Sequence, residues 1–145
     1  MSGEIDLEVV ASTAVLLRDK IKDLYIPAYY GEAGVLSHHL PYLSILKTGE
    51  ISYLDLADNR HYFFIEGGFM EVKGDKIVLI VDALEWGDEL DGESLQTQLA
   101  ETQTRIQSSF TGGITPEELA KELDKQRILS LKLDIVRKVK AVKKG

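Results

Sequence analysis

The sequence predicts an α+β protein, with an N-terminal antiparallel β-sandwich over residues 1–87 and a C-terminal antiparallel α-helical hairpin over residues 88–145. Two observations support this prediction. Up to Trp86, short runs of β-branched and aromatic residues alternate with turn signals about every 8–12 residues, which is typical of a sandwich. After Gly87 these residues thin out, and Leu, Gln, Glu, Ala and Lys recur at helical spacing.

The expected strands are short and separated by turns. Residues 5–10 alternate apolar and acidic side chains, and this period of two marks a half-buried strand. Further strands are expected at residues 14–17, 21–27, 42–46, 51–56, 61–65, 69–72 and 77–81. Turns are predicted at residues 47–50, 58–60, 67–68 and 73–75, which contain Gly, Asp or Asn.

Two helices are predicted in the second part. The first ends at Gly112-Gly113, and its apolar stripe, with Thr102 filling a gap, comprises Leu95, Leu99, Ile106 and Phe110. Thr115 is suited to cap the second helix, with Pro116 as its first residue and Glu118 as the capping-box partner. The stripe of the second helix comprises Leu119, Leu123, Ile128, Leu131, Ile135, Val139 and Val142.

The composition excludes several classes of protein. Cysteine is absent, so disulfides and thiolate metal sites are excluded. Apolar runs such as residues 77–81 are far shorter than the ~20 residues that span a bilayer, and the first residues lack the features of a secretory signal. We therefore expect a cytosolic or membrane-peripheral protein without direct membrane insertion.

Charge is unevenly distributed along the chain. Residues 1–87 carry 14 acidic and 7 basic residues, a net charge of −7, whereas residues 88–145 carry 10 of each. The acidic first part would repel phosphate, so nucleic acid is not expected as a partner. Residues 127–145 hold seven bases against one acid, Asp134. This segment is either a solvated helix end, where the macrodipole favours cations, or a basic surface for an acidic partner.

Residues 30–42 form the most distinctive motif. Gly31 and Gly34 flank Glu32, and two adjacent histidines precede Pro41. Glycine permits positive φ angles, and proline favours an extended conformation in the residue before it. The motif therefore predicts a shaped loop between strands.

This loop resembles the G-E-x-G-x-x-x-x-H-x-P loop of the ε subunit of F-type ATP synthases. Other segments resemble the same family in the same order and spacing. They are residues 5–10 (its opening strand), 46–49 (its L-K-P-G turn, with Thr48 in place of proline), 67–72 (its G-G-h-L-E-V strand), 77–83 (its V-T-V-L-A-D-x-A strand) and 118–128 (its second helix). The resemblance covers nearly the whole chain.

The resemblance implies a sandwich of about ten strands followed by a helical hairpin, and a mechanical role. The family's ε subunit is a non-catalytic part of the central stalk on the cytoplasmic face of the inner (plasma) membrane. It binds the γ subunit and the ring of c subunits, and helps to couple proton or sodium flow to ATP synthesis. Its hairpin can extend along γ, meet the α and β subunits and block ATP hydrolysis. No cofactor is implied.

The resemblance also implies roles for particular residues. The expected contacts to the c ring are Gly31, Glu32 and Gly34, and the expected contacts to γ are His39 and Pro41. On the hairpin, the expected regulatory contacts to β are Arg127, Lys132, Arg137 and Lys138.

A nucleotide site is not expected. The nucleotide-sensing signature of some bacterial members begins L-D-x-x-R-A, and residues 90–95 here read L-D-G-E-S-L. Asp91 is retained, but Ser94 stands in place of the arginine that would face a phosphate. Glu93 beside it would repel one.

The residues give little support for catalysis. Glu32, His38 and His39 are ligand types that zinc accepts, but adjacent residues in an extended segment point to opposite faces. No nucleophile motif surrounds Ser37, and no phosphate-binding glycine motif is present. The alternative to a rotor subunit is a free-standing β-sandwich adaptor or small-ligand module with a partner-binding helical hairpin.

Overall fold

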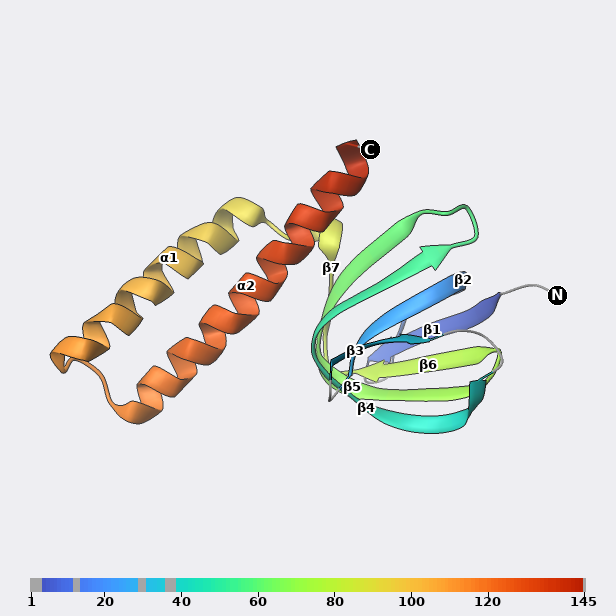
Figure 1. The fold of residues 1–145 in the computed structure, drawn as a ribbon, viewed down its shortest axis with the longest axis horizontal. Helices are drawn as coiled ribbons and strands as arrows, with labels where there is room; N and C mark the ends of the chain where they lie inside the picture. Colours follow the sequence, from blue (N-terminus) through green and yellow to red (C-terminus); the bar gives the residue numbers. More distant parts are fainter. Residues whose placement is uncertain (1–3, 12–13, 29–30, 36–38, 145) are drawn as a thin grey trace.

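The chain folds into a curved β-structure with a pair of helices on one side (Figure 1). The computed structural model describes residues 4–11, 14–28, 31–35 and 39–144, without the side chains of residues 28, 31–35, 39–42, 143 and 144. The strands are β1 (Ile5–Ala11), β2 (Ala14–Ala28), β3 (Gly31–Val35), β4 (His39–Asp55), β5 (Arg60–Gly74), β6 (Lys76–Val81) and β7 (Leu84–Trp86). The helices are η1 (Gly87–Glu89), α1 (Gly92–Ser108), η2 (Ser109–Thr111) and α2 (Pro116–Lys144).

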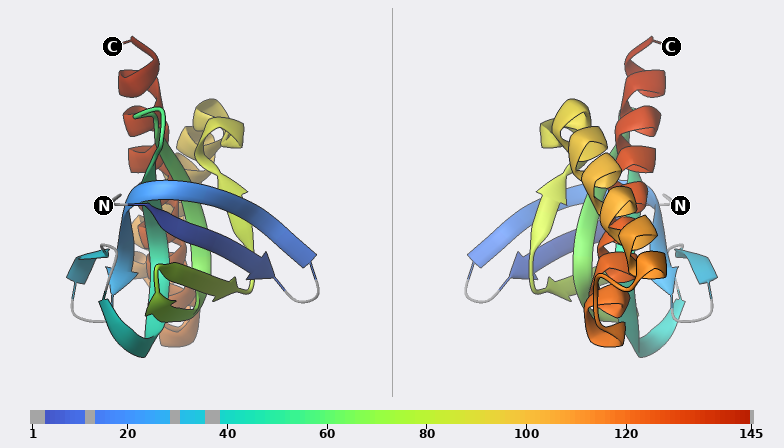
Figure 2. Two further views of the ribbon diagram at one scale, coloured as in Figure 1. Left: turned by 90° about the vertical axis from the view of Figure 1, so that its right-hand side faces the viewer. Right: turned by 90° about the vertical axis from the view of Figure 1, so that its left-hand side faces the viewer.

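The sheet closes on itself. Its order is β1-β6-β5-β4-β2-β3, and β1 also pairs with β2, while β7 pairs with β5. Figure 2 shows these strands wrapped around one interior, with the helical pair outside it. The predicted β-structure followed by two helices is therefore confirmed. The sheet is mixed rather than wholly antiparallel, because β1 and β6 pair in parallel.

The described residues form seven strands rather than about ten. The difference arises because three strands are 15 to 17 residues long. β2 joins two strands that were predicted separately, and β4 and β5 continue through places where turns were predicted. The predicted turn at residues 47–50 lies inside β4, where Thr48 pairs with Glu66 and Gly49 with Ile65 of β5.

The predicted turn at Gly67-Gly68 is a bend inside β5. Gly67 has a φ of 83° and Gly68 a φ of 148°. A Cβ atom on Gly68 would lie 2.1 Å from the carbonyl oxygen of Ile80, so only glycine fits there. Before the bend β5 pairs with β7, and after it β5 pairs with β6.

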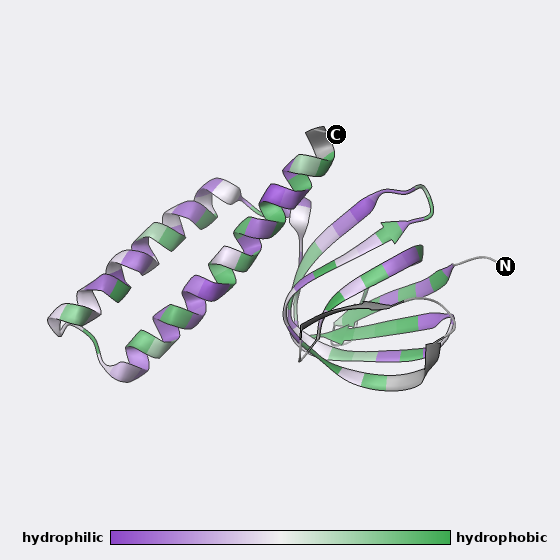
Figure 3. Ribbon diagram, in the orientation of Figure 1, coloured by the Kyte–Doolittle hydropathy of each residue, from purple (hydrophilic) through white to green (hydrophobic). Residues whose placement is uncertain are grey.

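The interior of the β-structure is apolar and tightly closed. Alternate side chains of β1, Ile5, Leu7 and Val9, are at most 2% exposed, as their period of two predicts. Figure 3 shows the resulting alternation of hydrophobic and hydrophilic residues along the strands. Phe63 of β5 completes this core, with its ring centroid 5.4 Å from that of Trp86.

Both helices begin at a capping residue, of which only Thr115 was predicted. The Asp91 carboxylate accepts a hydrogen bond from the Ser94 backbone N–H at the start of α1. Thr115 Oγ1 accepts one from the Glu118 N–H, which confirms Thr115 as the cap of α2. Phe110, however, lies in η2 after α1 and is 84% exposed, so it does not continue the apolar stripe.

Helix α2 has two apolar sides rather than the single predicted stripe. Leu129, Leu133 and Val136 form a cluster with Leu95 of α1. Ile135, from the predicted stripe, is fully buried on the side that faces the strands. The predicted stripe covers only one of these sides because it follows a single helical period.

Candidate functional site

The C-terminal half of α2 packs on the β-structure, and we call this contact the junction (Figure 1). On its other side α2 carries α1, and the far end of the helical pair projects away from the strands. The junction faces the outer side of β5. Phe63 and Ile65 point into the core of the β-structure, whereas Phe64 between them does not belong to that core. Phe64 is nevertheless only 1% exposed.

One ion pair crosses the junction beside Phe64. Lys132 Nζ lies 2.6 Å from a carboxylate oxygen of Glu85 on β7. The same ammonium group lies 4.9 Å from the centroid of the Phe64 ring, a distance that permits a cation–π interaction. Because the Lys132 side chain is only 16% exposed, water screens this pair less than it would a surface pair.

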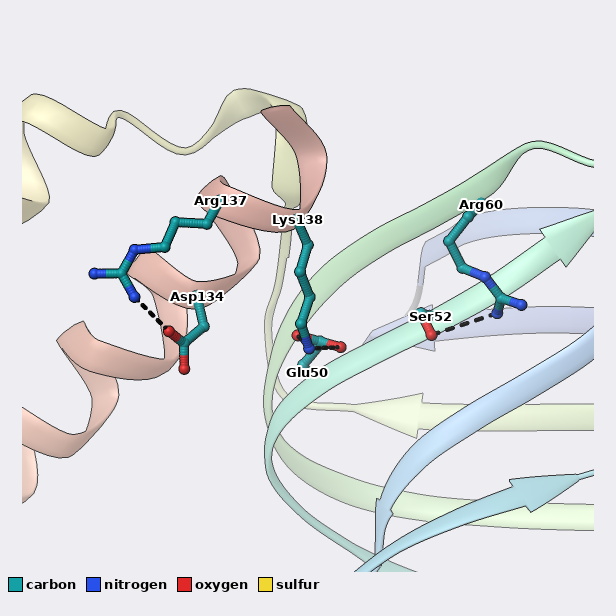
Figure 4. A network of polar contacts seen from close by, with 6 residues as sticks. All are labelled: Glu50, Ser52, Arg60, Asp134, Arg137 and Lys138. Atoms are coloured by element: carbon teal, nitrogen blue, oxygen red, sulfur yellow. Dashed lines mark hydrogen bonds and ion pairs between the residues drawn. The ribbon is translucent and has the colours of Figure 1, made fainter. Parts of the chain in front are cut away.

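A second ion pair crosses the junction nearer the C-terminus. Lys138 Nζ lies 2.8 and 3.0 Å from the two carboxylate oxygens of Glu50 on β4 (Figure 4). The Glu50 side chain is 14% exposed. The two lysines of α2 therefore reach two different strands of the β-structure.

Gly87 lies close to apolar side chains of α2 between these ion pairs. A Cβ atom at Gly87 would lie 2.9 Å from a methyl group of Ile135 and 2.9 Å from one of Val139. It would also lie 2.8 Å from the carbonyl oxygen of Tyr62. The absence of a side chain at this buried position lets α2 approach the strands closely.

The four basic residues expected to contact β do not share one face. Lys132 and Lys138 are directed to the β-structure, as described above. Arg127 and Arg137 instead pair with acids three residues earlier on α2, Asp124 and Asp134, each at 2.9 Å. Their side chains are 53% and 72% exposed, that of Lys138 is 49% exposed, and only Lys132, at 16%, is largely covered.

A polar cluster lies beside the junction. A cavity of about 350 Å³ opens between the last turns of α2 and the start of β5. His61 lines it, and its Nε2 lies 2.8 Å from Oδ2 of Asp55. The hydrogen bond from His61, with backbone N–H groups of Asn59 and Ala57, lowers the pKa of Asp55 to about 2. Burial, with the charges of Asp19 and Asp55, raises the pKa of Tyr53 to about 12.

Arg60 in the same cluster is already paired. Its two terminal nitrogens donate to both carboxylate oxygens of Asp23 at 2.6 and 2.7 Å, and this hydrogen bonding raises its pKa. A third, long contact of 3.5 Å reaches Ser52 Oγ (Figure 4). The guanidinium group is therefore a fixed structural element of this end of the sandwich.

A second surface carries exposed apolar side chains across five strands. Val15 on β2 pairs with Val10 on β1, which pairs with Ile80 on β6; Ile80 pairs with Phe69 on β5, and Phe69 with Ile45 on β4. We call these five residues the apolar row. Val15, Ile45, Phe69 and Ile80 are 47–57% exposed. A contiguous apolar surface of this kind is typical of a protein–protein interface.

The residues expected to contact the c ring lie in β3. Gly31, Glu32 and Gly34 pair with Ala28, Pro27 and Tyr25 of β2, at one end of the strand order. The Glu32 side chain lies outside the described residues.

Of the expected γ contacts, His39 begins β4 and its backbone pairs with Gly74. Pro41 follows in the same strand. The side chains of His39 and Pro41, and all of His38, lie outside the described residues.

Residues 90–95, which align with the nucleotide-sensing signature, have local partners. Asp91 caps α1, and Ser94 Oγ accepts a hydrogen bond from the Gln98 side chain at 3.1 Å. Among the described residues, no group of three or more His, Asp or Glu side chains could hold a metal ion. In the same part of the chain, none of the helices is long and apolar enough to cross a membrane.

Sequence comparison identifies the family. The profile of the "ATP synthase, Delta/Epsilon chain, beta-sandwich domain" matches residues 4–87. The ATP synthase epsilon chain of Carboxydothermus hydrogenoformans is 33% identical over 106 residues, which cover 73% of this chain and 78% of that protein. The ATP synthase epsilon chain of Desulfosudis oleivorans is 30% identical over 108 residues, or 74% and 81% of the two chains. The chain therefore belongs to the ATP synthase epsilon chain family.

Solved structures share the fold. One chain of the Euglena gracilis mitochondrial ATP synthase, in a structure of OSCP, F1 and c-ring in rotational state 1, aligns with a TM-score of 0.73 and 18% identity. This alignment covers 97% of the present chain and 82% of the Euglena chain. A chain from the central stalk and c-ring of the Tetrahymena thermophila enzyme aligns with a TM-score of 0.57 and 11% identity, covering 91% and 98%.

Sequence reasoning missed Glu50, Glu85 and Gly87, which meet α2 from the side of the strands. Their partners lie far away in the sequence; Glu50 and Lys138 are 88 residues apart. The sequence did contain a sign of the apolar row. Every residue of Ile77–Val81 is apolar, but only alternate residues of this strand can enter the core, so some apolar side chains must face outward.

Proposed function

We propose that this chain is a non-catalytic central-stalk subunit of a rotary ATP synthase. In this proposal residues 1–87 attach it to the rotor, and residues 88–145 restrain ATP hydrolysis. The complex would sit on the cytoplasmic face of the membrane, with this subunit peripheral. Membership of the epsilon chain family supports the proposal and disfavours a free-standing adaptor.

The observation that carries the assembly role is the apolar row. Side chains such as Ile45, Phe69 and Ile80 gain from being covered, at about 25 cal/mol for each Å² of apolar surface removed from water. We propose that the γ subunit covers this row, together with the neighbouring start of β4 at His39 and Pro41. The β3 segment with Glu32 would then meet the polar loops of the c ring.

The regulatory role is assigned to α2. Arg127 and Arg137 are exposed while the helical pair lies against the sandwich, so an acidic segment of β can reach them first. The Lys138 side chain is 49% exposed although it pairs with Glu50, whereas Lys132, at 16%, becomes available to β only if α2 leaves the junction. An exposed ion pair contributes only about 0–1 kcal/mol, so several contacts have to act together.

The assembly role is tested by co-purification of the full-length chain with γ. Replacing Phe69 by Ser should abolish co-purification, because it removes the centre of the apolar row. The control is Glu71→Ser, which lies two residues further along β5 and is also exposed. Circular dichroism would establish that both variants fold.

Two outcomes would decide against this assignment. If folded Phe69→Ser and Ile45→Ser variants both bind γ as the unmodified chain does, the row is not the interface. A chain ending at residue 87 should still bind γ; failure of the folded fragment to bind would place the interface on the helices instead.

A further inference from the structure

The cavity beside the junction, of about 350 Å³, combines apolar and acidic residues. Its apolar lining consists of two aromatic residues from the strands and two aliphatic residues from α2: Tyr62, Trp86, Val139 and Val142. Pockets that bind small molecules have volumes of about 300–1,000 Å³ and place a few polar groups among apolar side chains. The cavity therefore has the size and the lining of a site for a small organic molecule.

Two carboxylates without partners lie at this cavity. Asp88 and Glu89 of η1 both line it, and both are exposed. Within the part of the chain that the structure describes, neither carboxylate takes part in an ion pair or a hydrogen bond. Both negative charges therefore remain available to a ligand.

The basic residues that line the cavity are already engaged by acids. Arg60 donates to both carboxylate oxygens of Asp23, and His61 is held by Asp55, whose low pKa of about 2 keeps it ionised. Lys138 of α2 reaches Glu50 and is not part of the lining. The charge left at the cavity is therefore negative, and it lies on a β-structure whose residues 1–87 carry a net charge of −7.

We propose that this cavity binds a small organic cation, in which an ammonium group is carried on an apolar chain. The ammonium group would lie at Asp88 and Glu89, where it forms charge-assisted hydrogen bonds. The chain would lie against Trp86 and Val142, which remove its apolar surface from water. An anion is repelled by the same carboxylates, and a neutral molecule gains nothing from them. The site goes beyond the proposed function and does not depend on it.

The isolated full-length chain carries its own reporter for this site. Trp86 is the single tryptophan of the sequence, so tryptophan fluorescence observes the cavity directly. The probes are hexylamine, hexanol and hexanoate, which share a similar alkyl chain and differ in charge. At constant ionic strength, hexylamine should change the emission of Trp86 saturably. Hexanol should bind about tenfold more weakly or less, and hexanoate should give no saturable change.

Substitutions in the lining locate the binding. Asp88→Asn with Glu89→Gln should lower the affinity for hexylamine by about tenfold, because both carboxylates are removed. The matched control is Asp82→Asn with Glu93→Gln, which removes the same two charges at exposed positions outside the cavity lining. It should leave the affinity unchanged within about twofold.

A third variant changes the apolar wall. Val142 is 46% exposed, so Val142→Lys should leave the fold intact while placing a positive charge at the cavity. It should abolish the binding of hexylamine. Circular dichroism establishes that each variant is folded.

The proposal is overturned if hexylamine gives no saturable change, or if hexylamine and hexanol bind equally well. Equal losses of affinity in the two double variants would overturn it as well, because the overall charge of the chain, and not the cavity, would then attract the amine. Unchanged hexylamine binding by a folded Val142→Lys variant would place the amine outside the cavity.

Discussion

The β-structure has two outer faces that differ in their exposure: the helices of this chain cover one of them, and the described part of the chain leaves the other exposed. Around Phe64 on the first half of β5, helix α2 reduces the exposure of the ring to 1%. Around Phe69 on the second half, nothing in the described chain covers the ring, and it remains 49% exposed. In our proposal, the first face holds the helical pair that restrains ATP hydrolysis, and the second face is covered by another protein.

The largest effect that we expect is a difference in unfolding free energy between alanine substitutions at these two phenylalanines in the isolated chain. Phe64→Ala should cost about 3 kcal/mol of unfolding free energy, because it empties a fully buried site under Lys132. Phe69→Ala should cost less than about 1 kcal/mol, since the ring is half exposed. Urea unfolding measures both values. Equal losses of unfolding free energy in the two variants would contradict the view that α2 covers one face and leaves the other exposed.

The bend between the two faces gives the next largest effect. Gly68→Ala should cost about 2–3 kcal/mol, because its φ of 148° suits glycine and its methyl group would collide with the Ile80 carbonyl oxygen. Gly74→Ala is the control, with a φ of 62° and no atom within 4 Å of the added carbon. It should cost only about 1–2 kcal/mol, from backbone strain alone. Thermal unfolding of both variants compares them, and a smaller loss for Gly68→Ala would contradict the bend.

Acid should weaken the covered end of the sandwich through Asp55. Folding lowers the pKa of this carboxyl from 3.8 to about 2, chiefly through the hydrogen bond from His61. Its stabilising contribution is therefore fully present above pH 3.8 and is lost as the pH falls through about 2. In Asp55→Asn, unfolding free energy should fall less steeply over this range of pH, as measured by urea titrations. The same substitution at Asp134 controls for the loss of one negative charge, and an unchanged slope in Asp55→Asn would exclude the His61 contact.

The smallest expected effect is that of ATP on the helical pair. A ligand present at 100 times its dissociation constant would add about 2.7 kcal/mol of stability. We expect no such change, because Ser94 replaces the phosphate-facing arginine and is engaged with Gln98. Calorimetry with and without ATP measures the melting temperature. A clear rise would show that other side chains, such as Arg127 or Lys132, supply phosphate contacts.

Local features of the fold were predictable from the sequence. The burial of Ile5, Leu7 and Val9 follows from their alternation, and the cap at Thr115 follows from its hydroxyl group before Pro116. Both depend only on residues close together in the chain. The family resemblance was predictable for the same reason, because it rests on short segments in order.

Features that depend on distant residues were not predictable. The pair Gly67-Gly68 indicates a positive φ angle. A positive φ is compatible both with a turn that reverses the chain and with a bend inside one strand, so the sequence could not distinguish the two. The parallel pairing of β1 with β6 joins segments about 70 residues apart, and no local pattern encodes it. The basic residues of α2 could be counted, but which of them face Glu50 and Glu85 depends on how the helix docks.

We propose that the sandwich attaches this chain to the rotor and that the helical pair restrains ATP hydrolysis. The most direct test compares ATP hydrolysis by the assembled complex carrying either the full chain or a chain without residues 115–145. We predict that the deletion raises ATP hydrolysis, that the shortened chain still co-purifies with the complex, and that ATP synthesis is largely retained. Equal hydrolysis rates, with the shortened chain present in the complex, would contradict it.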